Sequence, residues 1–254
     1  MEDEKLSALK GFLNRLTRRS VLDESEQAAI LELPAQRTEV SAHRDFVRMD
    51  EDVEHACLVA SGLTGRFAQT AAGDRQFIAV HIPGDMVDLH SVVAPRVTTP
   101  LHALVNSVVW KIPHVALRTA ATRYPALAHA FWRDGIIDAN IIAQAVLNLG
   151  RRPARARVAH LLCEMATRFE TIGGGGRDGF DFPVTQIQLA DMLGLTSVHV
   201  NRMLRLLREE GLAEMAGGQV RILDWPGLVN AGDFDPTYLQ LHAIDFHLNA
   251  GAPG

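Results

Sequence analysis

Apolar residues near the start of the chain recur at helical spacing over residues 3–32. A first helix is predicted by one apolar face in steps of three and four, formed by Leu6, Leu9, Phe12, Leu13 and Leu16. A second, shorter helix is predicted to begin near Asp23, a residue type that caps helix N-termini, and to end before Pro34.

The pattern changes over Arg37–Pro113 to short apolar runs separated by turn residues. A turn at Ala72–Asp74 separates Leu63–Gln69 from Gln76–Ile82, and this arrangement predicts a hairpin. Leu101–Ile112 is predicted to form another strand pair or one long strand. Many short strands at this spacing are typical of a β-sandwich or a jelly-roll barrel.

A long helix is predicted from Pro125 to about Leu149. Its apolar residues occupy more than one face, so the helix needs two partners. One face can pack on the β-domain, and the other can pack on the same helix of a second subunit. The alternative is a helix that lies wholly inside its own domain. The residues assigned to the subunit contact are Ile136, Ala139, Ala143 and Val146.

The segment that follows is predicted to contain a helix over Arg155–Thr171 and a flexible loop at Gly173–Gly176. The four glycines have no Lys-Ser/Thr pair after them, so a phosphate-binding P-loop is rejected. Thr185 is suited to cap a short helix, Gly194 to break it, and Thr196 to cap a second helix that runs to about Glu209. This order predicts a helix-turn-helix.

The outward positions of the second helix carry arginines without an acidic residue before Glu209. Surface helices usually mix both charges, so a face of one sign suits a polyanion. The positions are Ser197, Val198, Asn201, Arg202, Arg205 and Arg208. Arginine can bridge guanine and asparagine can bridge adenine in the major groove. The alternative is a module of the same fold that makes only protein contacts.

A hairpin is predicted after the helix-turn-helix, where Leu212–Met215 and Val220–Leu223 flank Gly217–Gly218. A β-hairpin in this place is the wing of a winged helix. The segment Thr185–Arg208 is therefore predicted to be the element that reads DNA.

Composition narrows the class of protein. The 254 residues carry a net charge of -5, with 47% hydrophobic and 22% charged residues, which is an ordinary globular balance. No apolar run approaches a membrane span, and the charged N-terminus does not look like a signal peptide, so we expect a cytoplasmic protein with no membrane partner. Cys57 and Cys163 are far apart and are expected to be buried structural residues.

Residues 10–226 resemble the Crp/Fnr family of bacterial transcription regulators. The resemblance is most specific in the run T-x-x-x-L-A-x-x-L-G-L-T-x-x-x-V-x-R, which spans Thr185–Arg202, and His55–Asp85 looks like the β-roll of the family. It implies an α+β chain in four parts: a cyclic-nucleotide-binding-like jelly-roll domain over 1–124, a dimerisation helix over 125–150, a winged helix-turn-helix over 151–226 and a C-terminal tail over 227–254. It also implies double-stranded DNA and a second copy of the chain as partners, and it allows RNA polymerase as a third.

The motif carries site residues over by position. Ser197, Val198, Asn201 and Arg202 match the base-reading positions of the family, and Arg202 is expected to read a guanine. Gln186, Thr196, His199 and Arg205 match positions that touch phosphate or flank the bases. Many relatives have glutamate where this chain has Val198, which can only pack against a base, so we expect a different half-site.

The resemblance does not extend to the ligands of the family. The turn Pro83–Asp85 is not followed by the Gly-Glu pair of cyclic-AMP-binding relatives, and the stretch from Arg96 to Pro100 shows no Arg-Ser pair. We expect no cyclic AMP binding, because a buried phosphate needs a paired cation. No cysteine precedes Cys57, so the cysteine cluster of oxygen-sensing relatives is missing. The residues therefore name no effector or cofactor.

The residues favour three other functions less. Spread through the β-region are His81, His90, His102 and His114, whose spacing does not predict a metal site. No catalytic constellation is recognisable, so we do not expect an enzyme. A small-ligand sensor with a C-terminal module for protein contacts is the alternative function.

Overall fold

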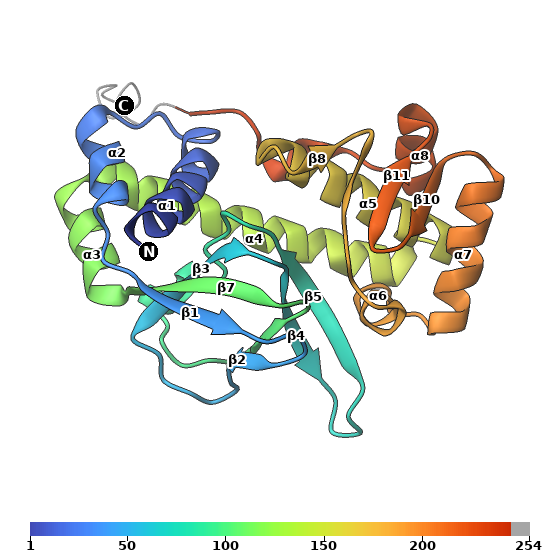
Figure 1. Cartoon of the computed structure of the whole chain (residues 1–254), viewed down its shortest axis with the longest axis horizontal. Coiled ribbons are helices and arrows are strands. Elements are labelled where there is room, and N and C mark those ends of the chain that lie inside the picture. The colour runs from blue at the N-terminus through green and yellow to red at the C-terminus, as the bar shows by residue number, and fades with distance from the viewer. Residues whose placement is uncertain (245–254) are drawn as a thin grey trace, which may run out of the picture. The chain divides into compact units, whose positions relative to one another are not determined.

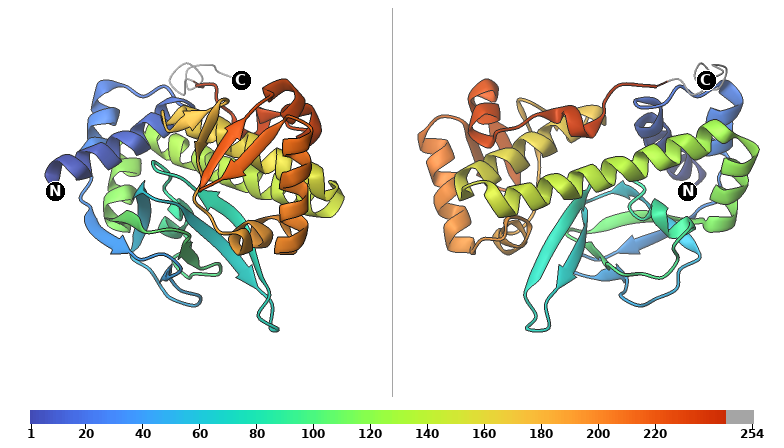
Figure 2. Two further views of the ribbon diagram at one scale, coloured as in Figure 1. Left: turned by 45° about the vertical axis from the view of Figure 1, so that its right-hand side comes forward. Right: turned by 180° about the vertical axis from the view of Figure 1, so that it is seen from behind.

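The computed structural model describes residues 1–244 and divides into two compact units (Figures 1 and 2). The first unit contains Met1–Thr64, His81–Ala139 and the chain from Leu239 onward. The second contains Gly65–Val80 and Asn140–Tyr238. No helix in the described part of the chain combines the length and the apolarity needed to cross a bilayer.

Two helices open the first unit, as predicted. α1 (Glu2–Thr17) buries the apolar face that the sequence indicates, and Phe12 stacks on Phe131 with ring centroids 6.1 Å apart. α2 (Glu24–Leu31) is capped by Asp23. The Asp23 carboxylate accepts a hydrogen bond from the Glu26 backbone N–H, and the Glu26 carboxylate accepts one from the Asp23 backbone N–H. This capping box satisfies two backbone donors that a helix start otherwise leaves unpaired.

The strands of the first unit form antiparallel sheets. β1 (Gln36–Val40), β7 (Ser107–Pro113) and β3 (His55–Ser61) pair in the order β1-β7-β3. β2 (Asp45–Val47) pairs with β6 (Leu101–Ala103). β6 and β7 thus belong to different sheets, so the prediction of one long strand or a strand pair at Leu101–Ile112 is wrong. The residues between them, 104–106, turn the chain from one sheet to the other, and strand periodicity alone does not record such a change of partner.

The predicted hairpin is confirmed. β4 (Thr64–Gln69) and β5 (Arg75–His81) are hydrogen-bonded neighbours, and Gly73 adopts a positive φ of 96° in the turn between them. Most of the hairpin belongs to the second unit. The predicted α+β class, with a β-rich N-terminal region followed by long helices and a helix-turn-helix, is confirmed.

The helix that follows β7 was not predicted. α3 (His114–Arg123) follows β7 directly and ends at Tyr124, and the short 3-10 helix η1 (Leu89–Val92) precedes β6. No side chain caps the start of α3, because Pro113 stands in the N-cap position. Leu117 is buried whereas Val115 is 63% exposed, so the apolar pattern is weak. Without a cap or a clear stripe, local sequence gives little signal for this helix.

The long helix is confirmed as α4 (Pro125–Arg151), 27 residues in length. Its first part lies in the first unit and its last twelve residues, from Asn140, lie in the second. Phe131 and Ile137 are buried, whereas Ile136 is 53% and Val146 is 65% exposed. The helix therefore has an inward face and an apolar face that no other part of the described chain covers.

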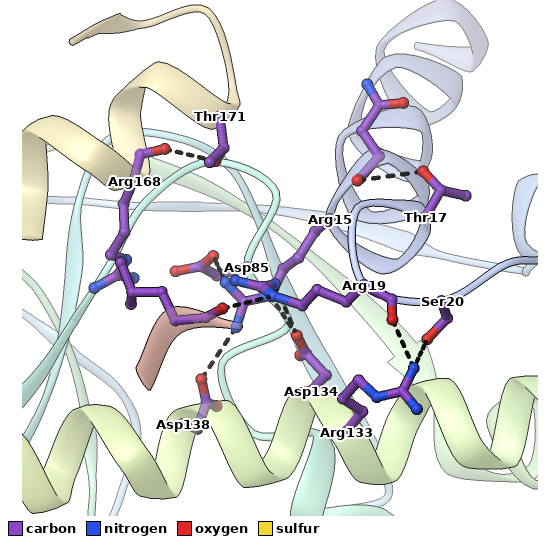
Figure 3. A network of polar contacts seen from close by, with 12 residues as sticks. Arg15, Thr17, Arg19, Ser20, Asp85, Arg133, Asp134, Asp138, Arg168 and Thr171 are labelled. Carbon is purple, nitrogen blue, oxygen red and sulfur yellow. Dashed lines mark hydrogen bonds and ion pairs between the residues drawn. The ribbon is translucent and has the colours of Figure 1, made fainter. Parts of the chain in front are cut away.

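A buried polar cluster holds α1 on α4 (Figure 3). Arg15 donates from Nε to Asp134 at 2.6 Å and from Nη2 to Asp138 at 3.1 Å, and its Nη1 pairs with Asp85 in the turn after β5. Burial opposes the charge of Arg15, but the three carboxylates outweigh it and raise its pKa above the ordinary value. Removing the guanidinium would leave buried carboxylates uncompensated, which is costly.

The second unit is built around α5 (Ala154–Thr171), a predicted helix. Its sheet has the order β10-β11-β9-β8, formed by β8 (Gly175–Gly176), β9 (Gly179–Asp181), β10 (Ala213–Ala216) and β11 (Gln219–Ile222). The predicted loop at Gly173–Gly176 is wrong in its second half, because the last two glycines form β8. A Cβ at Gly175 would lie 2.4 Å from the Gly179 carbonyl oxygen, so glycine permits this close pairing.

The chain continues beyond the wing as α8 (Trp225–Gly232) and a 3-10 helix, η2 (Pro236–Leu239). α8 spans the predicted boundary at residue 226 and packs on α5. η2 is a single turn that begins at Pro236. Residues 245–254 lie outside the described residues.

Candidate nucleic-acid interface

The first helix of the predicted motif is α6 (Gln186–Leu193). The Thr185 hydroxyl oxygen accepts from the Gln188 backbone at 3.1 Å, and the Gln188 side chain accepts from the Thr185 backbone at 2.8 Å. The capping box is local in sequence, so it starts α6 at Gln186 whatever the rest of the fold does. Leu189, Ala190 and Leu193 are buried and fix the helix on its unit.

Gly194 ends α6 in the left-handed conformation, with φ 60° and ψ 42°. A side chain at this position would be strained by the backbone and would also bring a Cβ to 2.7 Å from Leu149 Cδ2. Two residues later, Thr196 caps the next helix by accepting from the His199 backbone at 3.2 Å. The predicted break and the predicted second cap are both confirmed.

The turn is also held from outside the motif, within the same unit. Gln76 of β5 donates from Nε2 to the Met192 carbonyl oxygen at 3.1 Å, and Arg157 of α5 donates to the Leu193 carbonyl oxygen at 3.2 Å. These are carbonyls at the end of α6, which have no partner inside the helix. Sequence reasoning missed Gln76 and Arg157, because neither carries a local signal for a contact with α6.

The second helix of the motif is α7 (Ser197–Glu209). Val200, Met203 and Leu207 are buried and Leu204 is half-buried, so the predicted inward face is confirmed. This face packs against α5, α6 and β10. The packing fixes which side of α7 points to solvent.

The predicted site residues occupy the opposite side. Val198 is 80% exposed, and Asn201, Arg202 and Arg205 are exposed at the three- and four-residue steps that place them on one helix face. Thr196 is exposed at the start of α7, while Ser197 and His199 are half-buried there. Gln186 is half-buried at the start of α6, and its Oε1 has no hydrogen-bond partner among the described residues.

The charges of this face are largely uncompensated. Arg205 approaches Glu209 at 3.6 Å, and both side chains are more than 60% exposed, so the pair is worth little in water. Arg202 and Arg208 make no ion pair within residues 1–244. The N-terminus of α7 adds a partial positive charge beside Thr196. The face can therefore accept phosphate at its start and base edges along its first turns.

A wing follows α7. β10 and β11 pair antiparallel, and the turn between them uses Gly217 at φ 60° and Gly218 at φ 81°. Two consecutive positive φ values are typical of the tight turn that suits a two-residue hairpin. The predicted hairpin is confirmed. Ile187 on α6, an apolar residue, is 68% exposed, and no sequence pattern predicts this exposure.

The other candidate groups are not part of α6 or α7. His102 pairs with Asp45 at 2.6 Å, His114 with Ser91 at 2.8 Å, and His81 lies 3.7 Å from Asp85. Across the described residues, no three His, Cys, Asp or Glu side chains converge on one point as metal ligands would. Cys57 and Cys163 are buried as predicted, and burial raises the pKa of the Cys163 thiol to about 12. A protonated buried thiol is a poor nucleophile.

Comparison with known proteins agrees with this geometry. Residues 156–231 match the Crp-like helix-turn-helix domain. The chain is 28% identical over 170 residues to the transcriptional activator protein FnrA of Stutzerimonas stutzeri, covering 67% of this chain and 69% of that protein. It is 23% identical over 203 residues to the fumarate and nitrate reduction regulatory protein of Vibrio cholerae, covering 80% and 81%. The structure of FixK2 from Bradyrhizobium japonicum superposes with a TM-score of 0.71 at 26% identity, over 78% of this chain and 98% of that one.

Proposed function

Because this chain belongs to the Crp/Fnr family and is a DNA-binding transcription regulator, we propose that it acts as a homodimer that reads a palindromic operator through α7. The observation that carries the proposal is the face of α7. Its inward side is packed, whereas Val198, Asn201, Arg202 and Arg205 are held in solvent on one side. In a two-fold dimer, two such helices meet successive major grooves about 34 Å apart.

The exposed apolar stripe of α4 supports the homodimer. Ile136 and Val146 are more than half exposed, and Ala139 and Ala143 are exposed between them. With Trp132, which is 64% exposed, these residues repeat in alternating steps of four and three. That spacing is the seam of a left-handed coiled coil, so a second copy of α4 is the partner that fits it. The small alanines would allow the two helices to approach closely.

Each residue of the reading face has a role in the proposal. Arg202 makes a bidentate contact with guanine, and Asn201 contacts the neighbouring base. Val198 packs on a thymine methyl, because it has no polar group to pair with a base. Ser197, at the start of α7, is the remaining base-reading position, and the phosphates are contacted by Gln186, Thr196, His199 and Arg205.

We also propose that cyclic AMP is not the effector. Arg96 is the cation nearest to the expected phosphate position in sequence, yet it is at the surface and pairs with Asp50 at 3.3 Å and Asp52 at 3.5 Å. The segment after Gly84 instead buries two carboxylates, Asp85 and Asp88. Arg15 is already engaged by Asp85 and two further aspartates. A phosphate group of either one or two negative charges would therefore meet carboxylates here and not a free cation, which disfavours its binding.

The family also bears on enzymatic activity, location and partners. The relatives are transcription regulators and not enzymes, and the reading in which the C-terminal module makes only protein contacts is not favoured. A protein that regulates transcription acts where the chromosome is, so we propose a cytoplasmic location and RNA polymerase as a functional partner.

Selection of genomic DNA fragments by the purified full-length chain, without added ligand and at near-physiological salt, tests the proposal. The expected result is an enriched palindrome whose half-sites contain a guanine that depends on Arg202. A Val198→Glu variant should select a different base pair in each half-site, because glutamate accepts from cytosine. Binding that is salt-sensitive and blind to sequence, with and without extract metabolites, would contradict it.

A further inference from the structure

The segment Asp233–Tyr238, here called the C-terminal clasp, follows α8 and is not used by the reading face. It belongs entirely to the second unit, as do α5 and the last twelve residues of α4. α4 and α5 meet at the short junction Arg152–Pro153. The angle at this junction relates the helix that we assign to the dimer contact to the helices that read DNA.

The clasp begins by binding the junction itself. Arg152 is buried and donates from Nη2 to the Asp233 carbonyl oxygen at 3.0 Å and to the Asp233 carboxylate at 3.2 Å. Asp233 is in the left-handed conformation, with φ 46°, and this turns the chain at the end of α8. Gly232 immediately before it allows α8 to approach α5 so closely that a Cβ there would lie 2.6 Å from the His160 backbone nitrogen.

The clasp ends on both helices. The Tyr238 hydroxyl donates to Glu164 Oε2 of α5 at 2.7 Å, and its ring stacks on His160 at 6.1 Å and 14°. Its carbonyl oxygen accepts from Asn140 Nδ2 of α4 at 3.4 Å. Phe234 fills the space between, with ring centroids 5.3 Å from His160 and 6.2 Å from Tyr238. One residue therefore contacts the helix before the junction and the helix after it.

The chain beyond the clasp is fixed as well, by contacts inside the first unit. Leu239 is fully buried, and its carbonyl oxygen accepts from Arg19 Nε at 3.2 Å. Ile244 forms a parallel bridge with Ser20, donating to the Arg19 carbonyl oxygen at 3.0 Å. The clasp and the residues that follow it thus each make ordered contacts within their own unit.

We propose that the C-terminal clasp fixes the angle between α4 and α5, and that Tyr238 is a positioning residue for DNA reading. The inference rests on the proposed homodimer, in which this angle sets the distance between the two copies of α7 and so the spacing of the half-sites. A restrained angle lowers the ordering cost of engaging both half-sites together. Loosening the clasp weakens operator binding and reduces discrimination between spacings.

Amide hydrogen exchange of the full-length protein without DNA tests the clasp independently of DNA binding. Tyr238→Phe removes only the hydroxyl contact and should speed exchange over residues 148–156 by about fivefold, the effect of one hydrogen bond. Tyr238→Ala also removes the ring and should speed it by about 30-fold or more. Thr237→Ala is the matched control, because Thr237 is exposed and, among the described residues, its hydroxyl bonds only to Asp235, two residues earlier in the chain.

Operator binding supplies the second readout. The selected palindrome is compared with a version that carries one extra base pair between its half-sites. The wild type and Thr237→Ala should lose most affinity for the longer version, whereas Tyr238→Ala should bind the original more weakly and show a smaller loss on lengthening. The proposed role of the clasp is overturned if amide exchange at residues 148–156 is unchanged in Tyr238→Ala, or if exchange rises equally throughout the second unit. Tighter binding of the original operator by this variant would also overturn it. Failure of the wild type to bind any palindrome would instead overturn the proposed function.

Discussion

Two helix faces of this chain point away from its core, and they differ in chemistry. The outward face of α7 is polar and cationic, with Asn201, Arg202 and Arg205 around Val198. The outward face of α4 is apolar over several turns, with Ile136 and Val146 more than half exposed. A cationic face gains from phosphate and base edges, whereas an apolar face gains only from exclusion of water. We propose from this difference that nucleic acid is the partner of the α7 face and that a protein surface is the partner of the α4 face.

The largest effect is expected from a charge placed in the apolar face of α4. Ala143→Glu should prevent dimerisation, because the carboxylate would be buried without a partner. Loss of the second reading helix should reduce operator affinity by about 100-fold or more, the scale of the gain from linked binding sites. Sedimentation velocity measures the assembly, and fluorescence anisotropy with labelled operator measures the affinity.

The matched control for this substitution is Val115→Glu. Val115 is also an exposed apolar residue on a helix, at 63% exposure, but lies on α3. It should leave both the sedimentation coefficient and operator affinity unchanged. A dimeric Ala143→Glu protein with normal affinity would show that the apolar face of α4 is not the subunit contact.

The cationic face is tested by Arg202→Ala. The expected loss of operator affinity is about 1–3 kcal/mol, with relaxed preference at one base pair of each half-site, because a bidentate guanine contact disappears. Arg208→Ala on the same helix should weaken operator and random DNA alike and lower the salt dependence by about one phosphate contact. Equal losses on operator and random DNA for Arg202→Ala would remove its base-reading role.

Two glycines test how tightly the turn before α7 is packed. Gly194 and Gly217 both have φ 60°, but a Cβ would meet Leu149 only at Gly194, and open space at Gly217. Gly217→Ala should cost about 1 kcal/mol of unfolding free energy for the backbone alone. Gly194→Ala should cost about 1–3 kcal/mol more through overpacking. Urea unfolding measures both, and equal losses would mean that the turn has room to adjust.

The smallest expected effect concerns His160, whose side chain faces the packed interior between α5 and α8. Burial, and then Arg152, lowers the pKa of His160 below its ordinary value, despite the opposing effect of Glu164. The unfolded chain therefore binds the proton more readily, so this group costs stability as the pH falls below about 6.5. The unfolding free energy should fall by about 1 kcal/mol or less between about pH 7.5 and pH 5.5 on account of His160.

His160→Gln should show a smaller difference between the two pH values than the wild type, by urea unfolding. His242→Gln, at an exposed position, serves as the control and should retain the full difference. His55 and His114 also have pKa values lowered chiefly by burial and contribute with the same sign, so the dependence is reduced and not removed. An unchanged difference in His160→Gln would contradict the assignment.

The exposed face of α7 could be predicted from the sequence because its structural determinants are local. Thr185 and Thr196 cap their own helices, and Gly194 forms the turn between them. The inward and outward sides of α7 follow from one helical period. The hydrogen bond from Gln76 to the Met192 carbonyl oxygen could not be predicted, because the two residues are 116 positions apart in the sequence.

The errors in the fold have the same origin. β6 and β7 are close in sequence but pair in different sheets, and the difference depends on distant strands. Gly175 and Gly176 are residues typical of loops, but they form a strand because they pair with β9. α3 has neither a cap nor a clear stripe and was missed. In each case a tertiary contact decides the local structure, and composition does not report it.

The most direct test of the account is the dependence of binding on half-site separation. The purified protein is titrated against operators whose half-sites are one helical turn apart, about 10 base pairs, and against operators lengthened by about half a turn. We expect tight binding to the first and binding no better than that of a single half-site to the second, because the two copies of α7 then face opposite sides of the duplex. Equal affinity for both would contradict a dimer that reads DNA through two linked recognition helices.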